Sequence, residues 1–259
     1  RPVRLVMDTG RLPVYRTTVE KANELVPYYK QRNPEGLVMI GLGGGMAAEY
    51  TGDAASFARA RWQSYLHPEL ERIRPEVRKR VDYVAVANNL SEPRSVRQAE
   101  WWSEYAKALC ALCQKSEIRP LILSSGVGCL PCGDESQLRV LEAMLPGLRA
   151  ALACQGGWSC GAFSVDYTMD PQVESKYSLR YRRAYEFFRT KAPDLLALPM
   201  ILSEVGIDRS GDPNRDGYAA RGSAEKFSQW IAWFDSEINK DSCIRGGALF
   251  AIGTGGGWK

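Results

Sequence analysis

Two glutamates form the most informative pattern in the sequence. Glu92 follows an apolar segment that ends in amides, and Pro93 fixes the backbone directly after it. Glu204 follows a second apolar segment, Leu198 to Leu202, and stands two residues before Gly206. Two carboxyl groups held about 5 to 5.5 Å apart can cleave a glycosidic bond with retention, one as nucleophile and the other as acid/base. The elements that carry these glutamates must therefore bring them to one place.

Seven short apolar runs alternate with six helical segments along the chain. Uninterrupted Val, Ile and Leu runs of this kind are typical of a parallel sheet that is covered by crossover helices. Threonines that could cap a helix open the first helical segment, expected over Thr17–Arg32, and an apolar stripe marks another over Val96–Lys115. The expected strands are Val3–Met7, Leu37–Leu42, Val81–Asn88, Leu121–Ser125, Ala162–Tyr167, Met200–Val205 and Ala248–Ile252.

Polar side chains cluster directly after the expected strands. A doubly wound sheet places its ligand at one switch point, whereas a barrel builds its site from the carboxyl ends of several strands. The distribution therefore favours a TIM (β/α)8 barrel, and the absence of a linker-like tract predicts a single domain over residues 1–259. The residues concerned are Asn88, Asn89, Ser91, Glu92, Ser124, Ser125, Asp166, Tyr167, Glu204, Asp208 and Trp258.

Composition excludes several classes of function. The 259 residues are 45% hydrophobic, which suits a packed core, and the formal charge is only +4. Because the basic residues are scattered, no nucleic-acid surface is indicated. No apolar run approaches the roughly 20 residues needed to cross a bilayer, so no membrane contact is expected.

The order of these elements resembles glycoside hydrolase clan A, which includes families 5 and 39. In that clan an acid/base glutamate ends the fourth strand in an Asn-Glu-Pro motif, and a nucleophilic glutamate ends the seventh. If Glu92 ends the fourth strand, the expected strand that carries Glu204 becomes the seventh without adjustment. The resemblance covers nearly the whole chain, and it implies a retaining O-glycosidase with a poly- or oligosaccharide substrate and no cofactor.

The resemblance also implies roles for other residues. Val3-Arg4-Leu5 is similar to the second-strand segment whose arginine supports the nucleophile. Asp166 and Tyr167 are similar to the sixth-strand residues that line the site, although a His is common where Asp166 stands. Trp258 matches the eighth-strand tryptophan that forms a sugar platform. Ser91 replaces the asparagine that binds the sugar 2-hydroxyl, so Asn88 or Asn89 would supply that contact.

Two features of the natural protein are expected from this register. A complete barrel needs a first strand before Val3 and a last helix after Trp258, so we expect more residues at one or both ends. The clan's action on polysaccharides implies a secreted or extracytoplasmic location, although no signal segment is visible in the sequence.

Other readings of the same residues stay open. A Glu-Pro pair is common in loops that follow strands, whatever their function. The departures from the clan pattern at Ser91 and Asp166 would suit a catalytically inactive sugar-binding barrel. A third reading is a phosphate- or nucleotide-dependent barrel enzyme that uses the glycine-rich loop Gly41 to Gly45, although this loop lacks the lysine of a Walker motif.

The cysteine spacing suggests a zinc site that the elements argue against. Cys110 and Cys113 lie at the end of an expected helix, whereas Cys129 and Cys132 follow a strand, on the order of 20 Å away along that strand. No shared metal is therefore expected. Cys154 and Cys160 bracket a short turn and are close enough for a disulfide in an oxidising compartment.

Overall fold

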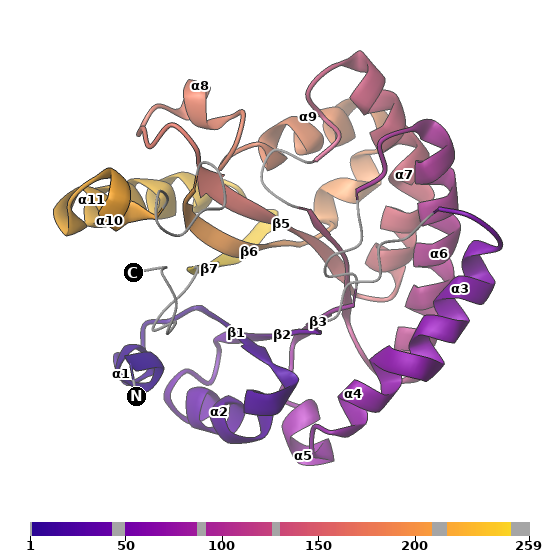
Figure 1. Ribbon diagram of the computed structural model, residues 1–259, viewed down its shortest axis with the longest axis horizontal. Helices are drawn as coiled ribbons and strands as arrows, with labels where there is room; N and C mark the ends of the chain where they lie inside the picture. The colour runs from indigo at the N-terminus through magenta and orange to yellow at the C-terminus, as the bar shows by residue number, and fades with distance from the viewer. Residues whose placement is uncertain (1, 43–49, 87–91, 126–129, 209–216, 250–259) are drawn as a thin grey trace.

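The computed structural model describes residues 2–42, 50–86, 92–125, 130–208 and 217–249. Within these residues, seven strands form one sheet in sequence order, and every neighbouring pair is parallel. The expected count and direction are therefore confirmed, and the sheet curls into a nearly closed barrel (Figure 1). The strands are β1 (Val14–Thr18), β2 (Leu37–Gly41), β3 (Tyr83–Ala85), β4 (Pro120–Ser125), β5 (Gly157–Ser164), β6 (Met200–Ile207) and β7 (Ile244–Leu249).

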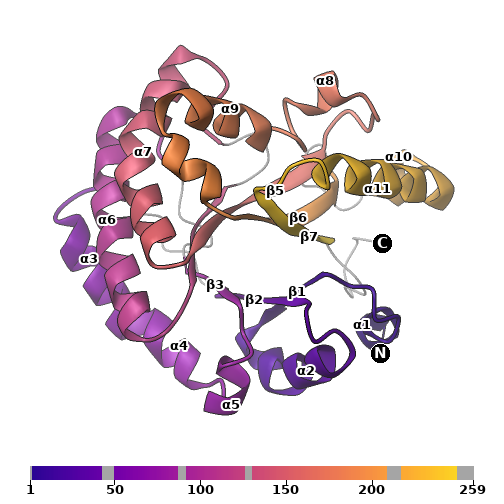
Figure 2. The ribbon, with the colours of Figure 1, turned by 180° about the vertical axis from the view of Figure 1, so that it is seen from behind.

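Helices cover the outer face of the sheet in an arc, as both ribbon views show (Figures 1 and 2). The largest packing surface within this arc joins α6 to α7, and α3 packs on the other side of α6. The helices are α1 (Pro2–Met7), α2 (Val19–Arg32), α3 (Ala54–Arg61), α4 (His67–Glu71), α5 (Pro75–Arg78), α6 (Val96–Lys115), α7 (Glu135–Ala153), α8 (Pro171–Glu174), α9 (Tyr181–Lys191), α10 (Tyr218–Arg221) and α11 (Ala224–Ile238), with a π-helix at Trp62–Leu66 and a 3-10 helix at Pro193–Ala197.

The first strand differs from the expected one. Val3–Met7 lies in the helix α1, and the first strand is Val14–Thr18, whose last two residues were expected to begin the helix. The sequence Val-Tyr-Arg-Thr-Thr is rich in the β-branched and aromatic residues that favour strands. Thr18 is both the last residue of β1 and the extended residue that precedes α2. The sequence pattern therefore indicates the start of a helix at this threonine and hides the strand that ends there.

The two edge strands of the sheet meet side by side. In the described residues no ladder joins β1 to β7, but Gly246 of β7 lies against Val14 of β1. A Cβ at Gly246 would stand 2.4 Å from Cγ2 of Val14, and the backbone there has a φ of +138°. Only glycine suits this conformation and this approach, so Gly246 allows the edges to come together.

The barrel interior is filled below the carboxyl ends of the strands. Buried side chains from five of the strands, two of them from β3, form an apolar layer that is separate from the outer helix-facing core. Such layers make a TIM barrel a packed core rather than a pore. The space above this layer is therefore where a site can form. The layer consists of Val14, Met39, Tyr83, Ala85, Leu121 and Ile201.

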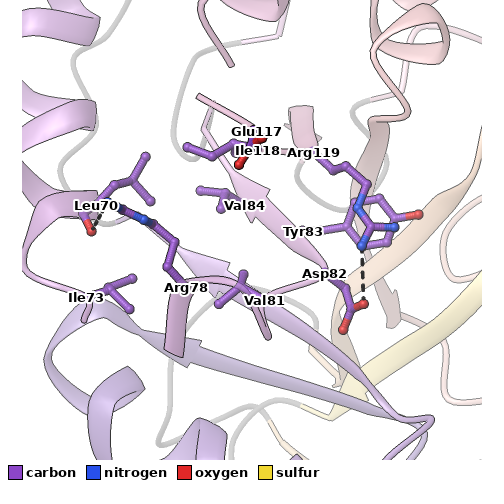
Figure 3. A pocket seen from close by; sticks show the side chains of 10 residues that line it. All are labelled: Leu70, Ile73, Arg78, Val81, Asp82, Tyr83, Val84, Glu117, Ile118 and Arg119. Atoms are coloured by element: carbon purple, nitrogen blue, oxygen red, sulfur yellow. Dashed lines mark hydrogen bonds and ion pairs between the residues drawn. The ribbon is translucent and has the colours of Figure 1, made fainter. Parts of the chain in front are cut away.

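An ion-pair clasp holds the opposite end of the barrel. Asp82, directly before β3, accepts bonds from the Lys30 ammonium at 2.9 Å and from the Val38 backbone N–H at 2.8 Å. Arg119, directly before β4, lies 3.5 Å from the same carboxylate. Figure 3 shows Asp82 and Arg119 beside a small pocket lined also by Tyr83. The clasp ties the amino ends of β2, β3 and β4 together.

The cysteines that the structure describes are free thiols. Cys154 and Cys160, which were expected to be close enough for a disulfide, instead point to different partners. Cys154 donates to the Ala151 carbonyl, and Cys160 lies 3.6 Å from the sulfur of Met200. The strand β5 starts at Gly157, earlier than expected, so Cys160 is fixed inside the sheet rather than at its start.

Candidate active site

Glu204 lies in the second half of β6 and is aimed by an irregularity in the strand. Leu202 pairs with Cys160 and Glu204 pairs with Gly161, so Ser203 is an extra residue without a counterpart on β5. A bulge of this kind bends the strand and re-aims the side chain beside it. The bulge is thus the local reason why the carboxylate of Glu204 leaves the regular in-out alternation of β6.

Arg16 of β1 reaches the Glu204 carboxylate. Its Nη1 donates to Oε1 of Glu204 at 2.6 Å and to the Ser203 carbonyl at 3.1 Å. Because alternate residues of a strand share a face, Arg16 lies on the same side of β1 as Val14, one layer nearer the carboxyl end. The ion pair therefore lies inside the barrel, above the apolar layer, with both side chains partly exposed.

The arginine expected in this position, Arg4, lies elsewhere. It is on the helix α1, where it bonds Glu24 at 2.6 Å and stacks over the Tyr28 ring. The expectation that Arg4 supports the nucleophile is therefore wrong, because its segment is a surface helix and not a strand. Arg16 could have been found from the sequence as the charged residue inside a short β-branched run.

Glu92 follows β3 and leads into α6. It is partly buried, Pro93 after it is buried, and Ser95 caps α6 by accepting the Gln98 backbone N–H. The short strand and the cap fix both ends of this connection. Glu92 and Glu204 thus come from the carboxyl ends of β3 and β6, two strands separated by two others in the sheet.

Tyr50 is a neighbour of Glu92 that the sequence analysis missed. It lies between β2 and α3 and is partly buried. Burial raises the pKa of its phenol above the usual range, and the negative charge of Glu92 raises it further. Arg94 opposes this effect. No motif marks Tyr50, since its place depends on how the loop after β2 folds.

The loop after β5 carries the expected residues Asp166 and Tyr167 in different environments. Asp166 is exposed, whereas Tyr167 is buried with a left-handed φ of +56°. The Tyr167 hydroxyl lies beneath the α10–α11 turn without a partner among the described residues, and the Lys226 ammonium stands 4.0 Å from its ring centre. The structure therefore makes Tyr167 a packing residue instead of one that lines the site.

A buried carboxylate organises this same loop. Glu174 is fully buried and accepts hydrogen bonds from the hydroxyls of Ser164, Thr168 and Ser178. The backbone N–H of Thr168 adds a further bond. These donors replace the water that a carboxylate loses on burial, so Glu174 fixes the path of the chain from Asp166 to α8.

Several expected site residues lie outside the described residues. They are Asn88, Asn89, Ser91 and Trp258, together with most of the glycine-rich loop Gly41 to Gly45. Of the expected substrate-binding set, the structure thus describes Arg4, Asp166 and Tyr167, and the described partner of Glu204 is Arg16 instead.

The chemical capacity of the described site is that of two carboxyl groups and one cation. Arg16 binds Oε1 of Glu204 and balances the charge of the carboxylate, which leaves Oε2 for another partner. Among the described residues, no group of three His, Cys, Asp or Glu side chains could hold a metal ion.

No helix in the described part is long and apolar enough to span a membrane.

Comparison with known proteins adds information on the fold. No family model and no curated protein sequence matches the chain. A GH5-4 broad-specificity endoglucanase from an uncultured bacterium superposes with a TM-score of 0.58 at 10% identity, over 97% of this chain and 78% of that one. A fungal beta-1,4-galactanase superposes with a TM-score of 0.60 at 12% identity, over 96% and 80%. The chain therefore has the barrel fold of these glycoside hydrolases.

Proposed function

We propose that this protein is a retaining glycoside hydrolase of the clan A type. The observation that carries the proposal is the Arg16–Glu204 ion pair inside the barrel, in a chain whose second candidate catalytic glutamate, Glu92, follows β3. In clan A, an arginine of the second strand supports the nucleophilic glutamate of the seventh strand. If Glu92 ends the fourth strand, β1 and β6 correspond to the second and seventh strands. Arg16 and Glu204 then match this pair. The fold shared with an endoglucanase and a galactanase supports the same assignment.

In the first step, an oxygen of Glu204 attacks the anomeric carbon while Glu92 gives its proton to the departing glycosidic oxygen. Arg16 holds Oε1, so the carboxylate is oriented and its charge is balanced before the attack. The bond to the leaving group breaks as the glycosyl ester forms. We expect the two carboxyl carbons to stand about 5 to 5.5 Å apart in the working enzyme.

In the second step, Glu92 is a carboxylate and takes a proton from water. The water oxygen attacks the anomeric carbon, the ester bond breaks, and Glu204 leaves as a carboxylate. The sugar is released with its original configuration. The two steps use only groups of the protein, the substrate and water, as expected for an enzyme of this kind.

The substrate class follows from the same assignment. We propose a poly- or oligosaccharide, and the similarity to an endoglucanase and a beta-1,4-galactanase makes glucans and β-1,4-galactans the first candidates. Asn88, Asn89, Asp166 and Trp258 remain proposed substrate contacts. A secreted or extracytoplasmic location remains part of this proposal.

The test is a substrate screen with purified protein and two variants. Chromogenic glycosides, β-glucans, galactan, xylan and mannan are incubated with the wild type, and any activity is repeated with Glu204→Gln and Glu92→Gln. Loss of activity in Glu204→Gln on every substrate supports the proposal. A wild-type rate in both variants would place the chemistry elsewhere, and sugar binding without turnover would favour an inactive sugar-binding barrel.

A further inference from the structure

Two strands of the sheet, β4 and β6, each carry an extra residue beside β5. On β4, Leu121 pairs with Gly157 and Ser124 pairs with Ser159, so three steps along β4 match two steps along β5. On β6, the extra residue is Ser203. Irregularities of this kind bend a strand and re-aim the side chains beside them. Ser124 is one of the polar residues that the sequence pattern places at a strand end, and neither catalytic step gives it a role.

The two irregularities bring a pair of hydroxyls together. The Oγ atoms of Ser124 and Ser203 stand 3.4 Å apart, although β5 lies between their strands in the curved sheet (Figure 1). Two strands that flank a third stand roughly 9 to 10 Å apart in a flat sheet. Short serine side chains meet across such a gap only on the concave face of a curved sheet. The contact therefore lies inside the barrel, and Ser203 is two residues after Ile201 of the apolar layer, on the same face.

The inner face of β5 leaves room for this contact. Three alternate residues of β5 belong to the outer core, so Ser159 and Gly161 between them face inward. The Ser159 hydroxyl is buried and donates to the Leu123 carbonyl at 3.0 Å, and Gly161 has no side chain. β5 therefore places no bulky side chain between the two hydroxyls. The three outward residues are Trp158, Cys160 and Ala162.

Ser203 is held from two directions. Arg16 of β1 donates to its carbonyl at 3.1 Å, and Ser124 of β4 meets its hydroxyl. Ser203 is buried, whereas Ser124 and Glu204 are partly exposed. Because Glu204 follows Ser203 directly, any rotation of the Ser203 backbone also turns the carboxylate. A contact that fixes Ser203 therefore fixes the direction of Glu204.

We propose that Ser124 is a positioning residue for Glu204: its hydroxyl holds the Ser203 side chain, so that the bulge keeps the carboxylate aimed at the anomeric carbon. The inference rests on the proposed function and adds a residue from β4, a strand that carries neither glutamate.

The length of the contact indicates where its effect will be seen. At 3.4 Å, the two oxygens are farther apart than in an ordinary bond between hydroxyls. Hydrogen bonds that serve catalysis are often long in an enzyme without substrate and shorten when the substrate binds. We therefore expect the contact to act on the reaction rate more than on the stability of the fold.

The first experiment measures kcat and KM separately for Ser124→Ala, Ser203→Ala and the double variant. Each single variant should lower kcat about 3- to 10-fold with little change in KM, as expected for the loss of one neutral hydrogen bond. The double variant should lose no more than the worse single variant, because both substitutions remove the same contact. Losses that multiply in the double variant, or an unchanged kcat in Ser124→Ala, would overturn the proposal.

Two further variants separate positioning from a general effect on folding. Ser124→Thr keeps the hydroxyl and should recover most of the kcat that Ser124→Ala loses. Ser103→Ala is the matched control, because Ser103 of α6 is buried and its hydroxyl donates to the Ala143 carbonyl at 2.7 Å, between two outer helices. It should lower the urea midpoint of unfolding and leave kcat unchanged. A Ser124→Thr enzyme as slow as Ser124→Ala, or an equal loss of kcat in Ser103→Ala, would contradict the positioning role.

A second experiment tests the contact without any substrate. Hydrogen–deuterium exchange with mass spectrometry of peptides that cover β6 reports how often the bulge opens. These peptides should exchange about 3-fold faster or more in Ser124→Ala than in the wild type, whereas exchange in peptides of β2 should stay the same. Equal exchange of β6 in both proteins would show that Ser124 does not hold the bulge.

Together the two experiments separate this inference from the proposed function. If Glu204→Gln retains full activity while β6 exchanges faster in Ser124→Ala, the proposed function fails, and the contact stands without a catalytic role. If Glu204→Gln is inactive and Ser124→Ala keeps the wild-type kcat, the proposed function stands and the role of Ser124 is wrong.

Discussion

The Arg16 guanidinium of β1 donates to the Glu204 carboxylate of β6 across 2.6 Å and also binds the carbonyl of Ser203. The second bond matters because Ser203 is the extra residue of the β6 bulge. One side chain thus contacts both the proposed nucleophile and the irregularity that aims it. Charge-assisted bonds of this kind contribute about 1.5 to 3 kcal/mol.

We predict that Arg16→Met lowers kcat/KM by about 10- to 100-fold, the factor that corresponds to the loss of one charge-assisted bond. The remaining Glu204 would be less well oriented and would lack its balancing charge. Steady-state kinetics on the best substrate of the screen measures the effect. Arg4→Met is the matched control, because Arg4 pairs only with surface groups. An equal loss in both variants would mean that Arg16 has no special role.

The leaving group should decide how much activity Glu92→Gln retains. With an activated aryl glycoside, whose leaving group needs no proton, the first step should proceed at near the wild-type rate. With a natural oligosaccharide it should slow by about 100-fold or more, which is typical for the loss of a general acid. Pre-steady-state kinetics on both substrates measures the contrast, and an equal slowing on both would contradict the acid/base role.

The clasp at the opposite end of the barrel should contribute to stability. Asp82→Ala leaves the N–H of the buried Val38 without its acceptor and leaves the Lys30 ammonium only the carbonyl of Gly36. We expect the free energy of unfolding to fall by about 2 to 3 kcal/mol, measured by urea denaturation. Glu76→Ala removes only an exposed pair with Arg74 and should cost less than about 0.5 kcal/mol. Similar losses of unfolding free energy in both variants would show that the clasp stabilises the fold no more than an exposed ion pair does.

One thiol should ionise more readily than a free cysteine. The S–H of Cys110 donates to the sulfur of Cys154, which lowers the pKa of Cys154, and the backbone N–H of Gly156 acts in the same direction. As pH rises, thiolate absorbance near 240 nm should therefore appear below the pH at which an ordinary cysteine ionises. Cys110→Ala removes the donor and should move this transition to higher pH. An unmoved transition would exclude the pairing.

The sequence contained enough to predict the barrel and the order of its glutamates, because apolar runs and the polar residues that follow them are local patterns. Glu204 and Glu92 both lie on the strands or connections expected for them. The first strand was misplaced because Val3–Met7 is the more apolar of the two short segments, whereas the sheet pairs Val14–Thr18 with β2. Arg4 was chosen for the same reason, with Arg16 only twelve residues away.

Contacts that depend on three-dimensional packing were beyond the sequence patterns. Tyr50 packs against Trp101 of α6, and nothing local in the sequence marks it. Tyr167 has the residue type expected for the site, but a left-handed backbone turns it into the core. Cys154 has a sequence neighbour in Cys160, yet its spatial neighbour is Cys110.

The most direct test of the central claim is to trap the glycosyl-enzyme and locate it. A 2-deoxy-2-fluoro glycoside with an activated leaving group, built on the sugar that the screen identifies, slows the second step so that the covalent intermediate accumulates. Mass spectrometry of the intact protein and of its peptides then finds the modified residue. We predict one added sugar, attached to Glu204. Attachment to another residue, or an unlabelled protein that turns over natural substrate with inversion, would contradict it.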